Sequence, residues 1–233
     1  MGKIYAGTSG WAYASWKPDF YPAKLAAARF LNHYATRLNS VEVNYTFRRM
    51  PSESLLQRWV EATPADFQFA LKAPQAITHI KRLRDTASTM AYFMDALEPL
   101  LKTEKLGPAL FQLPGNFKCD VARLREFLTL RPRWLRAAFE FRDESWFVED
   151  VYAALREAGV ALCLAESEDL ETPQVLTADF SYLRLRKPSY SAKALTPRVR
   201  ELARSGDVYV YLKHEDTPEG ASTAEAVLKA FKK

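Results

Sequence analysis

Short apolar runs alternate with longer amphipathic stretches along the whole chain, and this alternation constrains the fold more than any other feature of the sequence. We expect strands at the apolar runs, which occupy residues 3–6, 40–44, 67–72, 108–113, 137–142, 160–166, 182–186 and 208–212. Apolar residues at helical spacing predict helices after them, at about residues 23–38, 51–62, 86–102, 121–130, 148–158, 168–176, 195–204 and 221–231.

The number and order of these units predict the fold class. Parallel strands joined by helices are covered on both faces, which explains why the runs are almost continuously apolar. Eight strand-helix units in 233 residues predict an α/β fold, a TIM (β/α)8 barrel that residues 1–233 form as one domain. A doubly wound open sheet is the alternative, because the number of units does not distinguish a closed sheet from an open one.

Several classes of protein are excluded by what the sequence lacks. No apolar run approaches the roughly 20 residues that cross a bilayer, so we expect no membrane partner. The first residues carry no long apolar stretch followed by a cleavage site, which is against a signal peptide. The two cysteines, Cys119 and Cys163, form no Cys-x-x-Cys pair, so we expect no zinc site. This use of cysteine fits a protein of the reducing cytoplasm. The sequence gives no indication of an oligomeric state.

Polar side chains stand at the C-terminal ends of the apolar runs. Glu42 and Asn44 alternate with valines, and Glu140 and Arg142 alternate with phenylalanines. Other runs end in the same way, with Lys72, Gln112, Glu166, Arg184, Arg186 and Lys213, the last followed by His214. The C-terminal rim of a TIM barrel carries the active site, so we expect these side chains to converge on one cavity there. A structural ion network that closes the barrel is the alternative interpretation.

The balance of charge at this rim favours an anionic ligand. The three carboxylates and the five cations of this set are Glu42, Glu140, Glu166, Lys72, Arg142, Arg184, Arg186 and Lys213. The excess of cations predicts a bound phosphate or carboxylate, which Arg can hold with two hydrogen bonds. The net charge of +5 also leans toward anionic partners, although Arg and Lys are spread along the chain rather than concentrated as in a dedicated nucleic-acid-binding domain.

Three further residues are candidates for ligand contacts. Ser9 lies in a Gly-Thr-Ser-Gly segment whose backbone N–H groups could cradle an anion, although the segment is no nucleotide-binding fingerprint. Trp11 and Trp146 lie beside polar rim segments, where an aromatic face could stack on a base or a sugar. Lys72 and Lys213 have the strand-end position of a Schiff-base lysine, and nothing in the sequence singles out either one.

A metal site is less favoured than an anion site. Glu42, Glu140, Glu166 and His214 could ligate a divalent ion. Histidine is scarce, however, and five neighbouring cations would oppose a bound metal. We therefore expect no cofactor and no metal.

Motifs over nearly the whole chain resemble the YecE-like family, known as domain of unknown function 72. The most specific are Gly7-Thr8-Ser9-Gly10-Trp11, Val41-Glu42-Val43-Asn44, Ile77-Thr78-His79, Phe111-Gln112-Leu113-Pro114 and Glu140-Phe141-Arg142 with Ser145-Trp146. The resemblance implies a TIM barrel and no settled activity. The chain departs from the family pattern at Glu166, where many relatives carry Asp, at residues 184–187, where many have Arg-x-His-Gly, and at residues 212–216, where many have Phe-Asn-Asn.

Taken together, these features favour a cytoplasmic enzyme that hydrolyses an anionic, phosphate-bearing substrate, of which a nucleic acid is one example. Glu140 or Glu42 would be the general acid or base. The expected substrate-binding residues are Asn44, Lys72, Gln112, Arg142, Glu166, Arg184, Lys213, His214, Ser9, Trp11 and Trp146. The alternatives are a glycoside hydrolase that uses the Glu42/Glu140 pair, and a non-enzymatic protein that binds nucleic acid or another anion.

Overall fold

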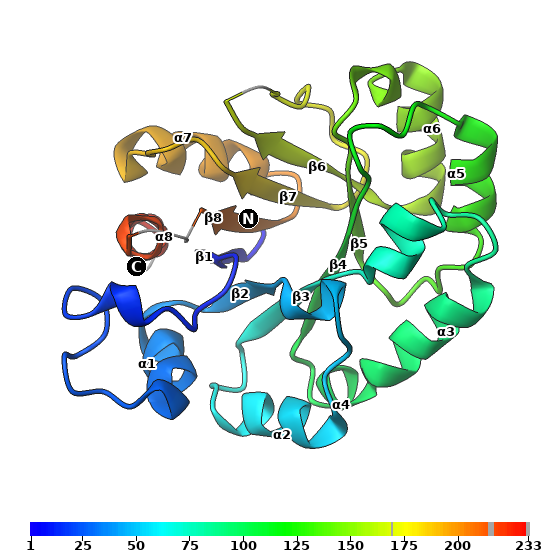
Figure 1. Ribbon diagram of the computed structural model, residues 1–233. Coiled ribbons are helices and arrows are strands. Elements are labelled where there is room, and N and C mark those ends of the chain that lie inside the picture. Colours follow the sequence, from blue (N-terminus) through cyan, green and yellow to red (C-terminus); the bar gives the residue numbers. More distant parts are fainter. Residues whose placement is uncertain (169, 214–216, 232–233) are drawn as a thin grey trace.

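Eight parallel strands form a nearly closed barrel, as the sequence predicted (Figure 1). The computed structural model describes residues 1–168, 170–213 and 217–231. The strands are β1 Ile4–Thr8, β2 Ser40–Val43, β3 Gln68–Lys72, β4 Leu106–Gln112, β5 Ala137–Glu140, β6 Ala161–Glu166, β7 Phe180–Leu185 and β8 Asp207–Leu212. Their order, β1-β8-β7-β6-β5-β4-β3-β2, brings the C-terminal ends of all strands to one end of the barrel, which we call the mouth.

Neighbouring strands of the barrel are paired by backbone hydrogen bonds, except β1 and β2, which the side chain of Asn39 joins. The amide of Asn39, just before β2, donates to the carbonyl of Ile4 at 2.8 Å and accepts from the N–H of Ala6 at 2.9 Å. The two strands approach so closely that a Cβ at Gly7 would lie 1.9 Å from the carbonyl oxygen of Ser40. Only glycine therefore fits at this point of the barrel wall.

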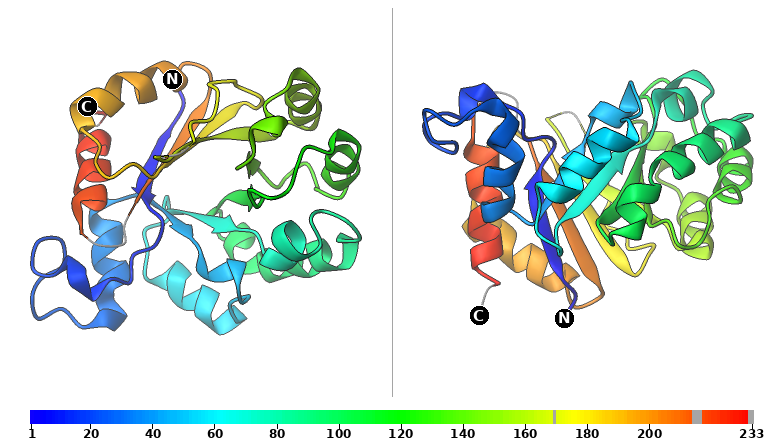
Figure 2. Two further views of the ribbon diagram at one scale, coloured as in Figure 1. Left: turned by 45° about the horizontal axis from the view of Figure 1, so that its top comes forward. Right: turned by 90° about the horizontal axis from the view of Figure 1, so that it is seen from below.

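Helices surround the barrel on all sides (Figure 2). They are α1 Phe30–Arg37, α2 Glu53–Glu61, α3 Ala87–Ala96, α4 Glu98–Lys102, α5 Val121–Leu128, α6 Glu149–Ala158, α7 Ala192–Leu202 and α8 Glu219–Lys229. Side chains of Ser52 and Asp120 accept the backbone N–H of Leu55 and Arg123 and so cap α2 and α5. Across the described residues, no helix is long and apolar enough to span a membrane.

Three helices differ from the sequence prediction. The helix expected over 23–38 begins only at Phe30, because residues 23–29 carry little apolar surface to bury. The helix expected over 86–102 is split at Leu97, since Pro99 has no N–H to continue the hydrogen-bond ladder. The expected helix at 168–176 is absent from the described residues of that stretch, which contain only a single bridge from Glu171 to Glu166.

Two layers of buried side chains explain why polar groups gather at the mouth. The larger layer lies between strands and helices. The smaller one fills the barrel, where tyrosines of β7 and β8 (Tyr182, Tyr209 and Tyr211) pack with small residues such as Ala70 and Ala138. Large rings next to small residues leave no room for a channel, so a ligand has access to the barrel interior only beyond the last tyrosine layer.

Candidate active site at the barrel mouth

Polar side chains at the ends of four strands point into the barrel because side chains alternate along a strand. Lys72, Gln112, Glu140 and Arg184 each stand two residues after a member of the buried layer inside the barrel, namely Ala70, Leu110, Ala138 and Tyr182. In the register of the sheet Gln112 lies directly beside Glu140. The inward polar layer expected from the sequence is therefore present.

Arg184 joins two carboxylates that are far apart in the sequence. Its Nε and Nη2 donate to Glu42 at 2.9–3.0 Å, and its Nη1 donates to Oε2 of Glu140 at 2.9 Å. Glu42 also accepts the hydroxyl of Tyr182 at 2.8 Å. All three charged side chains are buried. We call Glu42, Arg184 and Glu140 the buried ion cluster; it satisfies the requirement that charge in a protein interior be paired and hydrogen-bonded.

The cluster keeps both carboxylates ionised. Burial alone would raise the pKa of Glu42, but Arg184 and Arg186 outweigh it and hold this pKa at about 2. Burial opposes ionisation of Glu140 as well, yet Arg184 and Arg142 lower its pKa below the ordinary value. A carboxylate of lowered pKa is a weak base at neutral pH and holds no proton to donate. Both groups therefore act first as counter-ions.

Glu140 is the acceptor of a second chain of hydrogen bonds that leads to Lys72. Gln112 donates from Nε2 to Oε1 of Glu140 at 2.7 Å and accepts from Nζ of Lys72 at 2.8 Å. The same Nζ lies 4.1 Å from the centre of the Phe47 ring. Burial and the neighbouring Arg184 lower the pKa of Lys72 to about 8. Lys72 is thus a cavity group whose charge changes close to neutral pH.

A cavity of about 1040 Å³ opens above the buried ion cluster. Its described basic lining residues are Arg48, Arg49, Lys72, Arg142, Arg184, Arg186 and Lys213, and its described acidic ones are Glu140 and Glu166. Arg142 donates from Nε to Glu140 at 3.0 Å, and its side chain is 51% exposed. Within the part of the chain that the structure describes, the Nη atoms of Arg142 make no hydrogen bond, so both can contact a ligand.

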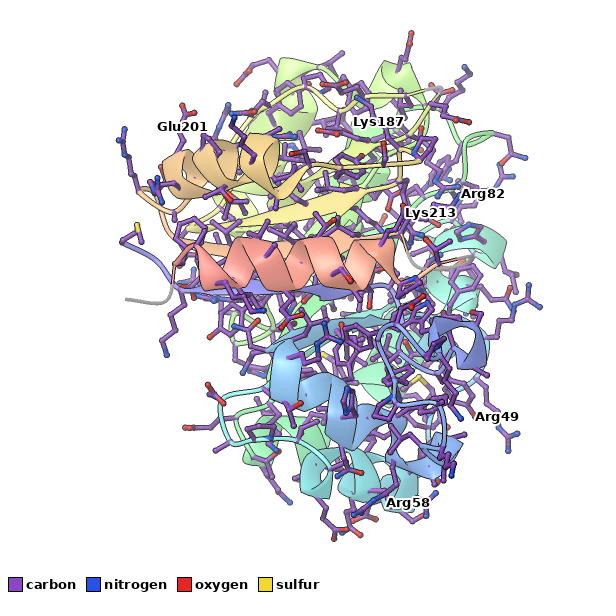
Figure 3. All side chains as sticks on the ribbon, turned by 90° about the vertical axis from the view of Figure 1, so that its left-hand side faces the viewer. Arg49, Arg58, Arg82, Lys187, Glu201 and Lys213 are labelled. Atoms are coloured by element: carbon purple, nitrogen blue, oxygen red, sulfur yellow. The ribbon has the colours of Figure 1, made fainter. Side chains whose placement is uncertain are left out.

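The basic character extends over the rim of the mouth. Figure 3 shows Arg49, Arg82 and Lys213 at the same end of the molecule, which is the mouth end, whereas Glu201 lies at the opposite end. These three side chains come from the segments after β2, β3 and β8. Several loops therefore contribute positive charge to one face.

Two smaller residues expected at the site also belong to it. Oγ of Ser9 accepts from Nη2 of Arg186 at 3.0 Å, and the backbone carbonyl of Ser9 accepts from Asn44 at 3.3 Å. Oδ1 of Asn44 accepts from Nη2 of Arg184 at 3.4 Å. Ser9 and Asn44 thus orient the arginines, and the hydroxyl of Ser9 is already engaged by a guanidinium.

Glu166 departs from the expected arrangement. Its carboxylate is bound by Arg198 of α7 and by the hydroxyl of Tyr190 at 3.1 Å, not by the buried ion cluster. The reason is the side-chain alternation in β6, where Cys163 and Ala165 point into the barrel and Glu166 points toward the helices. Glu166 lines the cavity, as expected, but its carboxylate is turned away from the buried ion cluster.

The two tryptophans do not offer the expected stacking surface. Trp146 is 0% exposed, stacks on Phe141 at 4.8 Å and donates from Nε1 to the carbonyl of Phe117. Packing has drawn it into the core, so the expectation that it stacks on a ligand is wrong. Trp11 is half-buried with its ring edge-on to Trp59 at 5.4 Å, and it is not among the residues that line the cavity.

Two expectations remain: that Lys213 and His214 contact the substrate, and that an anion rather than a metal binds at the mouth. Lys213 lines the cavity, and His214 lies outside the described residues. Over residues 1–168, 170–213 and 217–231, no group of three His, Cys, Asp or Glu side chains is close enough to hold a metal ion. Nothing in that donor set favours a cation over an anion at the mouth.

The sequence missed several residues of the site. Arg48 and Arg49 line the cavity from the short turn that follows β2. Tyr182, which donates to Glu42, could have been found from its place two residues before Arg184 on the same strand face. The loop residues had no such signal, because loop conformation is not fixed by residue alternation.

Comparisons with known proteins place the chain among relatives of the same fold. The family model described as "Protein of unknown function DUF72" matches residues 5–233. The UPF0759 protein YunF of Bacillus subtilis is 33% identical over 156 residues, which are 64% of this chain and 54% of that protein, so the match spans about half of the relative. The UPF0759 protein YecE of Escherichia coli is 25% identical over 207 residues, 86% of this chain and 73% of that protein.

A solved structure supports the architecture. The crystal structure of a DUF72 family protein from Thermotoga maritima is 29% identical to this chain and superimposes with a TM-score of 0.87. The superposition covers 99% of this chain and 100% of the other. The nearly closed eight-stranded barrel is therefore shared with an experimentally determined relative.

Proposed function

The chain belongs to the DUF72 family of proteins of unknown function, as its motifs indicated, and we propose that its barrel mouth is an enzyme site for a phosphate-bearing organic anion. The observation that carries the proposal is the charge of the cavity. Glu42 and Glu140 are held by Arg184 below it, and Glu166 is turned toward α7. Among the described residues, seven basic side chains line the cavity, Lys72, Arg142 and Lys213 among them, against the two carboxylates of Glu140 and Glu166.

A phosphate or carboxylate group suits this surplus of positive charge. Arg142 can present both Nη atoms of a planar guanidinium, the geometry that binds two oxygens of such a group at once. Lys72 adds a point charge, and Gln112 links it to Oε1 of Glu140, the oxygen that Arg142 also contacts. Anions held in a partly dehydrated cavity by several cations are bound more strongly than at an open surface. The expected ligand is therefore small enough to enter the mouth and doubly charged.

The reaction at this site stays a prediction, and hydrolysis is the class favoured by the sequence. The geometry supports a different division of roles from the one first expected. Glu42 and Glu140 position Arg184 and Gln112, and their lowered pKa values make them poor general acids. Lys72, with a pKa of about 8, is the better candidate for a group that exchanges a proton near neutral pH.

The glycoside hydrolase alternative has weaker support. Glycosidases place the bond to be cleaved between two carboxyl groups. Here one guanidinium, that of Arg184, is hydrogen-bonded to both Glu42 and Glu140 at 2.9 Å and occupies the space between them. A sugar could not take that place without breaking the buried ion cluster. A neutral sugar also has no need of the basic cavity.

Calorimetric titration with inorganic phosphate tests the proposal, at low salt and with Arg142→Met as the variant. Loss of a charge-assisted contact of about 1.5 kcal/mol should weaken binding about tenfold. The matched control is Arg58→Met, which removes an exposed arginine of α2 that is not among the residues lining the cavity and should leave the affinity unchanged. If both substitutions weaken phosphate binding equally, the loss comes from the lower net charge of the protein, and the proposed site is contradicted.

A nucleic acid is the polymeric form of such an anion, and the same titration separates it from a small ligand. A non-enzymatic nucleic-acid binder would lose affinity steeply as salt rises, because binding releases counter-ions from the polymer. Binding of inorganic phosphate that persists at physiological salt supports the small-molecule site, whereas binding of single-stranded oligonucleotides without binding of phosphate supports the polymer.

A further inference from the structure

Lys72 differs from the other cations of the mouth in what it contacts. Its Nζ is hydrogen-bonded to the neutral amide oxygen of Gln112 at 2.8 Å and lies 4.1 Å from the Phe47 ring. Gln112 is itself fixed, because its Nε2 donates to Glu140 at 2.7 Å. Oε1 of Gln112 therefore keeps facing the amine. An amide oxygen can accept a hydrogen bond from a neutral amine as well as from an ammonium group.

Among residues 1–168, 170–213 and 217–231, no carboxylate contacts Nζ of Lys72 directly. The carboxylate on its side of the barrel, Glu140, accepts hydrogen bonds from Gln112, Arg142 and Arg184. These two arginines also repel a charge on the amine, and the half-buried site removes part of its hydration. A lysine that is desolvated next to other cations is a neutral nucleophile for a larger fraction of the time.

We propose that Lys72 is a nucleophilic amine that condenses with the carbonyl carbon of a phosphate-bearing aldehyde or ketone. The nitrogen lone pair forms the C–N bond while the C=O π bond breaks. The nitrogen then gives up its two protons to the oxygen, which leaves as water, and an imine remains. The step needs no oxidant and no reductant. It rests on the anion site proposed above, which would hold the phosphate while the carbonyl reaches Nζ, and it names the substrate class of that site.

Two other lysines show why Lys72 is the one singled out. Lys105 is also buried, but its Nζ donates to the carbonyls of Val60 and Thr63 at 2.7 Å and to Oγ1 of Thr63 at 3.0 Å. These acceptors surround the end of α2, outside the mouth, and engage every proton of the ammonium group. Lys213 lines the cavity, yet it has no counterpart of the Gln112 and Phe47 contacts within the described part of the chain.

Reductive trapping tests the proposal with pyridoxal 5′-phosphate as probe. The full-length protein is incubated with the probe at pH 8, reduced with borohydride, and digested, and the modified lysines are identified by mass spectrometry. We expect Lys72 to be the most heavily modified lysine. Pyridoxal, which lacks the phosphate, should label it about tenfold less, the change expected from losing one charge-assisted contact. Excess inorganic phosphate should protect Lys72 from the probe.

Lys72→Arg and Lys213→Arg are the matched variants, because each keeps the positive charge of one cavity lysine and removes its amine. Lys72→Arg should abolish the phosphate-dependent label, and Lys213→Arg should leave it in place. The proposal is overturned if Lys213 or surface lysines are labelled as readily as Lys72. It is also overturned if pyridoxal labels Lys72 as readily as pyridoxal 5′-phosphate does. Phosphate binding by calorimetry without trapping at Lys72 would reject the imine and leave the anion site standing; loss of both would reject the two proposals together.

Discussion

Both ends of the barrel carry ion pairs and further basic side chains, but they differ in how the buried charges are joined. At the opposite end, Arg136 donates to Asp207 at 2.8 Å, one charge against one. Beside this pair the rings of Tyr5 and Tyr209 stack at 4.6 Å and fill the barrel. At the mouth, Arg184 is shared by two carboxylates and further basic side chains line a cavity above them.

This difference separates structural charge from functional charge. A charge pair that is neutral on its own and lies beside stacked rings needs no ligand, and its worth is a modest contribution to stability. In the buried ion cluster the charges are paired with one another, whereas the cations that line the cavity above it can still bind an anion. The mouth should therefore show two kinds of response to substitution, loss of folding for the buried ion cluster and loss of binding for the cavity cations.

The largest effect is expected from Arg184→Met, which leaves Glu42 and Glu140 buried without their shared partner. Breaking a buried pair by removing one side costs about 3–5 kcal/mol, because the remaining charge is uncompensated. Urea denaturation of the variant should show a loss of this size in the free energy of unfolding. Adding Glu42→Gln to Arg184→Met should recover part of the loss, since it removes one of the two orphaned charges. A loss below about 1 kcal/mol in the single variant would mean that solvent reaches the cluster.

The alternation of strands and helices was enough to predict eight strand-helix units, because each unit shows its own period, and the family resemblance implied that they close into a barrel. The alternation was also enough to predict that Glu42, Glu140 and Arg184 turn inward. Their joining by one guanidinium was not predictable, since Arg184 stands 142 residues from Glu42 and 44 from Glu140. That pairing depends on the closure of the sheet, which brings β2, β5 and β7 around one lumen.

The errors in the prediction also have physical reasons. In β6 every residue from Ala161 to Ala165 is apolar, so the alternation gives no clue to which face is inward; Glu166 lines the cavity but points toward the helices rather than into the barrel. Trp146 follows β5 closely in the sequence, but the short helical turn at Glu144–Trp146 folds it back onto Phe141. Position along the chain predicts the neighbourhood of a side chain, whereas packing decides whether it faces the ligand or the core.

An intermediate effect is expected when pH removes one cation from the cavity. The pKa of Lys72, about 8, lies below the ordinary value for lysine because of burial and Arg184. Lys72 is therefore charged below pH 8 and neutral above it, so anion affinity should fall as pH rises through 8. Sulfate is the suitable probe because it does not change its own charge in this range. We expect its affinity to drop about fivefold between pH 7 and pH 9, roughly 1 kcal/mol for one lost charge.

Lys72→Arg is the control for this pH profile, because arginine keeps its charge throughout. Its sulfate affinity should be flat across the same range. The lowered pKa of Lys72 also affects stability, which should rise with pH, whereas anion affinity should fall. The unfolded chain binds the proton more tightly than the folded one, so Lys72 favours the fold increasingly as pH rises above 8 toward the ordinary value. A sulfate affinity that stays constant in the unchanged protein would show that Lys72 is not part of the anion site.

The smallest effect is expected at the end of the barrel opposite the mouth, where Arg136→Met removes the partner of Asp207. The Arg136 side chain is 40% exposed and that of Asp207 is 22% exposed, so water replaces much of the lost contact. Asp207 also keeps the backbone N–H of Lys3 at 2.9 Å. The free energy of unfolding should fall by at most about 1 kcal/mol, and the methionine can still cover the ring of Phe180, which the guanidinium now faces. Phosphate affinity should not change, because a neutralised pair at the far end contributes little field at the mouth. A loss of stability equal to that of Arg184→Met, or any loss of phosphate affinity, would contradict the separation between the Arg136–Asp207 pair, which is neutral on its own, and the proposed ligand site at the mouth.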